Sequence, residues 1–96
     1  MNELRYHCDP ESGQPHIYDH GVTEQEVAEV FADKWRREYA SLKTSRVLNG
    51  QTAAGRYLKV IYVPDLFGPG IFVITAYDLI GKPLKAYRRQ MRRRRP

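Results

Sequence analysis

The chain has 96 residues, which is enough for one domain with a single modest core and too few for two. With 42% hydrophobic and 28% charged residues, its composition is that of a folded globular domain and excludes global disorder. Its apolar runs are far shorter than the roughly 20 residues that a membrane-spanning helix needs, so no membrane partner is expected. The first residues lack the pattern of a signal peptide, which predicts a cytoplasmic protein.

The net charge of +5 is unevenly distributed along the chain. Residues 82–96 carry eight basic side chains and no acidic one, whereas residues 1–81 carry eight basic and eleven acidic side chains. Such an asymmetry is typical of a protein that binds a polyanion or an acidic protein partner. The alternative is a solvated basic tail, over residues 88–96, that only assists solubility.

The N-terminal part of the chain is predicted to hold a strand, a loop and one or two helical turns. The strand is expected over residues 4–8, and the loop over residues 9–15, which contain two prolines and a glycine. Residues 16–20 can form the helical turns, which Gly21 would stop. Cys8 is the only cysteine, so it lacks a partner for a disulfide and is expected to act as a small hydrophobe.

The clearest helix signal begins at Thr23. Thr23 and Glu26 have the spacing of a capping box, in which each side chain accepts a hydrogen bond from the backbone amide of the other residue. Apolar residues with helical spacing follow, and they are Val27, Val30 and Phe31. The sequence therefore predicts a helix from about Glu24 to about Asp33.

Three strands are predicted in the middle of the chain. Residues 41–48 form the first, and Asn49-Gly50 after them is a turn signal or the start of a longer loop. Residues 56–63 and 71–77 are rich in β-branched and aromatic side chains and predict the other two strands. The last strand is apolar on both faces, so it is expected near the sheet centre with a helix covering one side.

A basic helix is predicted to follow the last strand. Pro83 is tolerated in its first turn, and its apolar positions have helical spacing, namely Leu84, Tyr87 and Met91. Helices followed by strands and a further helix indicate the α+β class. The predicted fold is a single domain over residues 1–96, with a compact antiparallel sheet of three to four strands, two N-terminal helices and the basic C-terminal helix.

The order of several short motifs resembles one toxin family. Asp9-Pro10 is followed by His20-Gly21-Val22-Thr23, and later by Gly55-Arg56 and by Ile74-Thr75-Ala76. This pattern is similar to that of BrnT-type toxins of the RelE-like superfamily, or of a closely related domain of unknown function. The resemblance implies a RelE-like fold and a metal-independent endoribonuclease toxin of a type II toxin–antitoxin pair. It also implies two partners, RNA and a cognate antitoxin with an acidic segment, in a homodimer or a toxin–antitoxin hetero-oligomer.

The chain departs from the family pattern at three positions. Cys8 replaces a tryptophan, His16 replaces a frequent asparagine, and Tyr77 replaces an arginine in the last strand. The third difference bears on catalysis, because an arginine there is a candidate for binding phosphate. The alternative function is therefore a non-enzymatic module of the same fold that binds RNA or protein.

Four side chains are predicted to be catalytic. Metal-independent RNA cleavage needs a base for the ribose 2′-hydroxyl, an acid for the leaving oxygen and a cation for the phosphate. His16 and His20 are four residues apart, so a helical segment would put both on one face, where they could move protons. Arg56 would hold the phosphate. Tyr77 would act as an acid or stack on a base, with simple packing as its alternative.

These candidates also have structural alternatives. His16 can be solvated and His20 can pack beside the following glycine, or the two can form half of a metal site, although no zinc-ligand spacing accompanies them. Arg56 can form a salt bridge with Asp65 or with Asp78. No metal and no cofactor are expected.

Further basic residues are predicted to hold RNA, namely Arg36, Arg46, Lys59, Arg88, Arg89, Arg92 and Arg93. In Trp35-Arg36-Arg37 an aromatic residue stands beside two cations, which suits single-stranded RNA. The alternative is that Trp35 completes the apolar stripe of the preceding helix. The terminal arginines would supply affinity without sequence specificity, and they could equally dock an acidic antitoxin segment.

Overall fold

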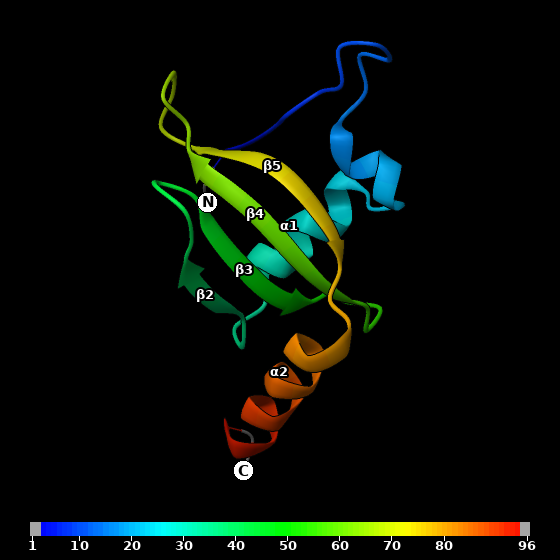
Figure 1. Cartoon of the computed structure of the whole chain (residues 1–96), viewed down its shortest axis with the longest axis vertical. Helices are drawn as coiled ribbons and strands as arrows, with labels where there is room; N and C mark the ends of the chain where they lie inside the picture. The colour runs from blue at the N-terminus through cyan, green and yellow to red at the C-terminus, as the bar shows by residue number, and fades with distance from the viewer. Residues whose placement is uncertain (1–2, 95–96) are drawn as a thin grey trace.

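A five-stranded mixed sheet is the centre of the computed structural model, which describes residues 3–94 (Figure 1). In chain order the elements are β1 (Leu4–Tyr6), a 3-10 helix η1 (His16–His20), α1 (Glu24–Ala32), β2 (Arg37–Ala40), β3 (Arg46–Gln51), β4 (Tyr57–Pro64), β5 (Ile71–Asp78) and α2 (Gly81–Arg94). The strand order is β1-β5-β4-β3-β2. The predicted α+β class is therefore confirmed. No helix among residues 3–94 is long and apolar enough to span a lipid bilayer.

The sheet is larger than predicted and is not purely antiparallel. Strands β2 to β5 form an antiparallel meander, but β1 adds a fifth strand that runs parallel to β5. The expectation of three to four antiparallel strands is therefore wrong. A strand was expected over residues 4–8 and is present as β1, but its parallel place in the sheet was missed because it pairs with a segment more than sixty residues away, and such a pairing leaves no local signal in the sequence.

The strand predicted over residues 41–48 begins only at Arg46, and the turn predicted after it is wrong. Residues 41–45 form the turn between β2 and β3, in which Lys43 has a positive φ of 55° and the Ser41 amide donates to the Ser45 carbonyl. Asn49 and Gly50 lie inside β3. A Cβ atom on Gly50 would come within 2.8 Å of Val30 Cγ1, so the glycine permits close approach of α1 and does not form a turn.

Only one of the two N-terminal helices is an α-helix. The first, η1, is a five-residue 3-10 helix, which ends at Gly21 with a left-handed φ of 67°. The second, α1, matches its predicted start, and both hydrogen bonds of the capping box between Thr23 and Glu26 are present. The structure therefore has one N-terminal α-helix where two helices were predicted, although the helical turns over residues 16–20 and their stop at Gly21 are confirmed.

Most of the core lies between α1 and one face of the sheet. Every second residue of β4 is buried, from Leu58 through Val60 to Tyr62. The remaining buried members come from η1, α1, the segment between these two helices and the neighbouring strands, and they are Ile17, Val22, Val27, Val30, Leu48, Ile71, Val73 and Ala76. In Figure 1 helix α1 passes behind the sheet, while the face toward the viewer is not covered by any of the labelled helices.

A second apolar cluster attaches α2 to one end of the sheet. Tyr87 and Met91 are buried with Leu79, and Leu84 packs against them, which confirms the predicted docking residues. Trp35 also packs in this cluster. It lies beyond the end of α1 at Ala32, so it does not extend the apolar stripe of that helix.

Candidate functional site

Three of the four predicted catalytic side chains lie next to one another. Helix η1 packs beside β5, so the ring centroids of His20 and Tyr77 are 5.6 Å apart, and those of His16 and His20 are 5.3 Å apart. His7 extends the group, with its ring 6.2 Å from that of His16. All three histidines of the chain therefore gather at the edge of β5.

A polar row continues from Tyr77 across the uncovered face of the sheet. Tyr77 pairs directly with Lys59 of β4, Lys59 with Asn49 of β3, and Asn49 with Arg37 of β2. Directly paired residues point to the same face, and their Cβ atoms are about 4.5–5.5 Å apart. We call Arg37, Asn49, Lys59, Tyr77 and the adjoining His20 the polar row.

Asn49 carries an unused hydrogen-bond acceptor within this row. Its side chain is 5% exposed, and its Oδ1 atom is buried without a hydrogen-bond partner among the described residues. A buried acceptor without a partner costs about 1–3 kcal/mol, so such an atom is typical of a site that binds a ligand or an ordered water. Asn49 and Arg37 were missed as site residues, because strand register is needed to align them with Lys59.

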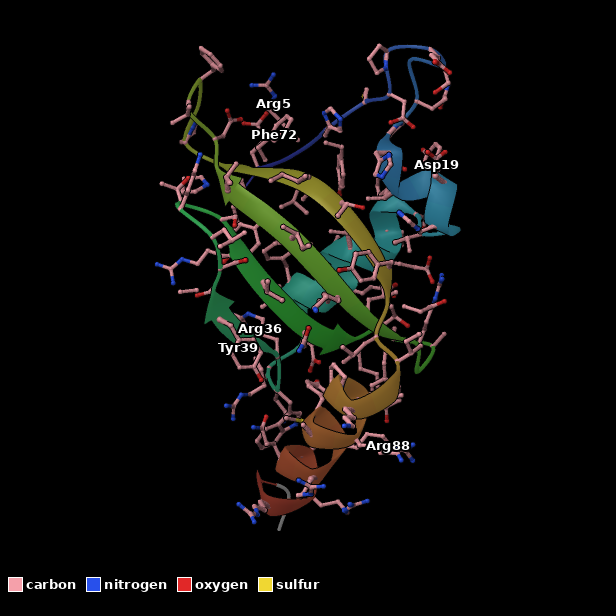
Figure 2. The ribbon with its side chains drawn as sticks, viewed as in Figure 1. Arg5, Asp19, Arg36, Tyr39, Phe72 and Arg88 are labelled. Atoms are coloured by element: carbon pink, nitrogen blue, oxygen red, sulfur yellow. The ribbon has the colours of Figure 1, made fainter. Side chains whose placement is uncertain are left out.

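The uncovered face leads at one end to a groove beside α2. The groove has a volume of about 430 Å³ and is lined by Gln51, Tyr57, Arg88, Met91 and Arg92. Tyr57 lies two residues before Lys59 on the same face of β4, and the Arg88 guanidinium lies 5.9 Å from the Tyr57 ring centroid. Figure 2 shows Arg88 projecting from the side of α2. The basic helix therefore adjoins the end of the sheet where the polar row lies.

At the opposite end of the uncovered face, Val63 of β4 and Phe72 of β5 pair directly. Arg5 of β1 and Phe72 of β5 pair directly, and both are seen at the end of the sheet that is far from α2 (Figure 2). Arg5 Nη1 lies 3.2 Å from Asp65 Oδ2. Asp65 is thus paired with Arg5 and not with Arg56.

Arg56, the fourth predicted catalytic residue, is bound by protein groups. Its Nε donates to Asp78 Oδ1 at 2.7 Å, and its Nη1 donates to both carboxylate oxygens of Glu26 at 3.1 Å. The same guanidinium donates to the backbone carbonyls of Gly21 and His20 at 2.9 and 3.4 Å. Of the two salt bridges considered for Arg56, the one with Asp78 is present. Because Arg56 binds the carbonyls of the last residue of η1 and of the glycine after it, its side chain holds the end of η1 in place.

The electrostatics around Arg56 follow from these contacts. The hydrogen bond to Asp78 raises the pKa of Arg56, which is therefore protonated at all ordinary pH values. Burial alone would raise the pKa of Glu26, but hydrogen bonds from the Thr23 amide and from Arg56 together lower it below its ordinary value. Glu26 thus accepts hydrogen bonds both within the capping box of α1 and from Arg56.

His16 is held by two carboxylates. Its Nδ1 atom lies 2.9 Å from Asp9 Oδ1 and 3.4 Å from Asp19 Oδ2. The hydrogen bond with His16 lowers the pKa of the Asp9 carboxyl. A carboxylate on one imidazole nitrogen fixes the orientation of the ring, so the arrangement holds His16 against His20.

The remaining predicted RNA-binding residues divide between several surfaces. Arg88, Arg89, Arg92 and Arg93 are exposed on α2. Arg46 is exposed on β3, but it pairs with Tyr62 of the core face and so points to the α1 side. Arg36 lines a groove beside α1 with Phe31 and Ala32, whereas the adjacent Arg37 points to the uncovered face. The structure therefore places Arg88 and Arg92 at the groove next to the face that carries Lys59, and it places Arg36 and Arg46 elsewhere.

No model of a known protein family matches this chain, and neither does any curated protein. The resemblance to BrnT-type toxins consequently remains a prediction that rests on the motif residues themselves.

Proposed function

We propose that this protein is a metal-independent endoribonuclease whose site is the polar row on the uncovered face of the sheet. The observation that carries this proposal is the alignment of Lys59, Tyr77 and His20, which supplies a cation, a phenol and an imidazole side by side. In such a site the imidazole of His20 takes the proton of a ribose 2′-hydroxyl, and the 2′-oxygen attacks the adjacent phosphorus. The bond to the 5′-oxygen breaks, Tyr77 donates its proton to that oxygen, and a 2′,3′-cyclic phosphate remains.

The charges in and near the row suit an RNA substrate. Lys59 would stabilise the additional negative charge on the phosphate, and Arg37 is the second cation of the row. The α2 arginines would bind phosphates further along the strand, because single-stranded nucleic acids are held by basic grooves. Arg56 has a positioning role in this scheme, since it binds the backbone at His20 and Gly21.

The test is cleavage of a labelled single-stranded RNA by the purified, untagged protein in excess EDTA. We expect His20→Gln to lower the cleavage rate by about 10²–10⁴-fold, the usual contribution of general acid–base catalysis. Lys59→Gln should also lower the rate, whereas the matched control Arg46→Gln, on the opposite face, should not. If the wild type does not cleave, or if His20→Gln cleaves as fast as the wild type, the proposal is wrong.

The toxin role is a separate part of the proposal. It rests on the motif resemblance, which implies a cognate antitoxin with an acidic segment. We expect induced expression to arrest growth with cleavage of cellular RNA, and His20→Gln to relieve the arrest. Cleavage in vitro without growth arrest would retain the nuclease and reject the toxin.

A non-enzymatic binding module is the second candidate function. Arg56 is already paired with two carboxylates, and Tyr77 stands where the motif resemblance implies an arginine, so the site has fewer free cations than the resemblance implies. This candidate predicts RNA binding without cleavage. Binding weakened by Lys59→Gln, together with intact RNA under all conditions, would favour the module over the nuclease.

A further inference from the structure

The segment from Asp9 to Asp19 folds back on itself and brings three metal-binding side chains together. Asp9 is the first residue of the loop over residues 9–15, and His16 and Asp19 belong to η1. The loop is closed by hydrogen bonds from the Asp9 amide to the Gln14 carbonyl and from the His16 amide to the His7 carbonyl. One ligand atom from each of Asp9, His16 and Asp19 lies within 4.8 Å of the other two.

The distances within this group fit a tetrahedral metal site. His16 Nδ1 is 2.9 Å from Asp9 Oδ1 and 3.4 Å from Asp19 Oδ2. In a tetrahedral zinc site with bonds of about 2.0–2.1 Å, neighbouring ligand atoms are about 3.3 Å apart. The two separations from the His16 nitrogen are thus already close to those that a bound ion would give, and the two carboxylate oxygens lie within 4.8 Å of each other.

The chemistry of the group favours a transition metal over magnesium. An imidazole nitrogen suits Zn²⁺ and its neighbours in the periodic table, whereas Mg²⁺ prefers oxygen ligands only. One nitrogen and two carboxylate oxygens leave the fourth position of a tetrahedron for water. The two carboxylates also compensate the charge of a divalent cation.

We propose that Asp9, His16 and Asp19 form a binding site for one Zn²⁺-class ion, which fastens the loop after β1 to η1. This inference is independent of the proposed nuclease, because none of its three ligands carries a proton-transfer step in that scheme. Bound metal would hold η1 by coordinate bonds in addition to its packing on β5. The position of His20, whose ring lies 5.3 Å from that of His16, would then be fixed more firmly.

The first measurement is calorimetric titration of the untagged, EDTA-treated protein with Zn²⁺ alone and, separately, with Mg²⁺ alone. We expect one Zn²⁺ per chain and no detectable binding of Mg²⁺ at the same concentrations. Binding of Mg²⁺ as tight as that of Zn²⁺ would mean that the group attracts any divalent cation by its negative charge alone, and would overturn the proposal. An absence of Zn²⁺ binding would mean that His16 is only an ion-pair partner of the two carboxylates, and would overturn it as well.

Substitutions of the proposed ligands test where the ion binds. His16→Gln and Asp19→Asn should each weaken Zn²⁺ binding by at least about tenfold, since outer-shell changes alone cost 10–100-fold. The Asp19 side chain is 60% exposed, so Asp19→Asn is expected to fold normally. The matched controls Glu11→Gln, an exposed acid of the same loop, and Cys8→Ser should bind as the wild type does. Unchanged binding by Asp19→Asn, or lost binding by Cys8→Ser, would assign the metal to other ligands and reject this site.

Discussion

Arg56 binds four acceptor groups at the place where η1, α1 and β5 meet. Two are the carboxylates of Glu26 and Asp78, and two are the backbone carbonyls of His20 and Gly21. A hydrogen bond to a charged group contributes about 1.5–3 kcal/mol, and removal of the guanidinium leaves several acceptors unpaired. Arg56 thus stabilises the fold and positions the end of η1.

Replacing this residue should therefore lower stability. We expect Arg56→Ala to reduce the free energy of unfolding by about 1–3 kcal/mol, measured by urea denaturation. The matched control is Arg46→Ala, which removes an exposed arginine from β3 and should change stability by less than about 0.5 kcal/mol. Equal losses for the two variants would contradict a structural role for Arg56.

Glu26 makes the stability of the protein depend on pH. Its pKa is lowered in the folded state from an ordinary value of 4.5, so the unfolded chain binds the proton more readily. Its contribution is then complete above pH 4.5 and is lost as the pH falls through the lower, folded-state pKa. The difference in unfolding free energy between wild type and Glu26→Gln should shrink from pH 7 to pH 3. A difference that stays constant over this range would show that the carboxylate charge does not matter.

At the level of elements, α1 could be predicted closely because its signals are local. The capping box between Thr23 and Glu26 fixes its first turn, and Val27 and Val30 are buried as their spacing indicates. The docking of α2 through Tyr87 and Met91 follows in the same way from helical periodicity. Periodicity identifies the buried face of an element, which is why these two helices agree with expectation.

Asn49-Gly50 shows why the strands were harder to predict. The dipeptide is a strong turn signal on its own, but tertiary packing decides its conformation here. Gly50 lies opposite Val30 of α1, where only a residue without a side chain permits the observed approach. The same strand register that buries Gly50 also pairs Asn49 with Lys59. The polar row could not be predicted because this register depends on contacts between strands, which leave no local signal in the sequence.

Gly50→Ala tests this explanation. The added methyl group would come within 2.8 Å of Val30 Cγ1 in the buried core, so we expect a loss of about 1–3 kcal/mol in unfolding free energy. Gly68→Ala is the control, since a Cβ there would make only ordinary contacts at 3.6 Å or more in an exposed loop. A Gly50→Ala protein with the stability of the wild type would show that α1 can move away from β3 without cost.

For the whole molecule, charge separation is the main feature that the sequence predicted. The described part of the basic segment lies in α2, and two of its arginines, Arg88 and Arg92, line the groove next to the uncovered face. Arg89 and Arg93 are also exposed but are not among the residues that line this groove. The contribution of these two pairs to RNA binding should therefore differ.

The salt dependence of RNA binding distinguishes the two pairs. If Arg88 and Arg92 contact phosphates, replacing both by glutamine should reduce the slope of log K against log salt by about 0.7 per lost contact. Replacing Arg89 and Arg93 removes the same charge and should reduce the slope less. Fluorescence anisotropy with a labelled RNA strand measures both. Equal reductions would indicate that α2 acts as diffuse charge and that the groove has no specific part in binding.

The parallel pairing of β1 with β5 has a consequence during synthesis of the chain. Leu4 pairs with Ile71, so β1 cannot pair until β5 has been synthesised, and the sheet is completed only then. Ribosomes add about 5–20 residues per second, which makes the interval roughly 3–13 s. Throughout that interval the segment that becomes β1 has no partner within its own chain, and after β5 emerges its edge stays free until β1 pairs with it. An extended segment of another nascent chain can occupy such an edge, so slow translation or molecular crowding on polysomes should favour aggregation of this protein.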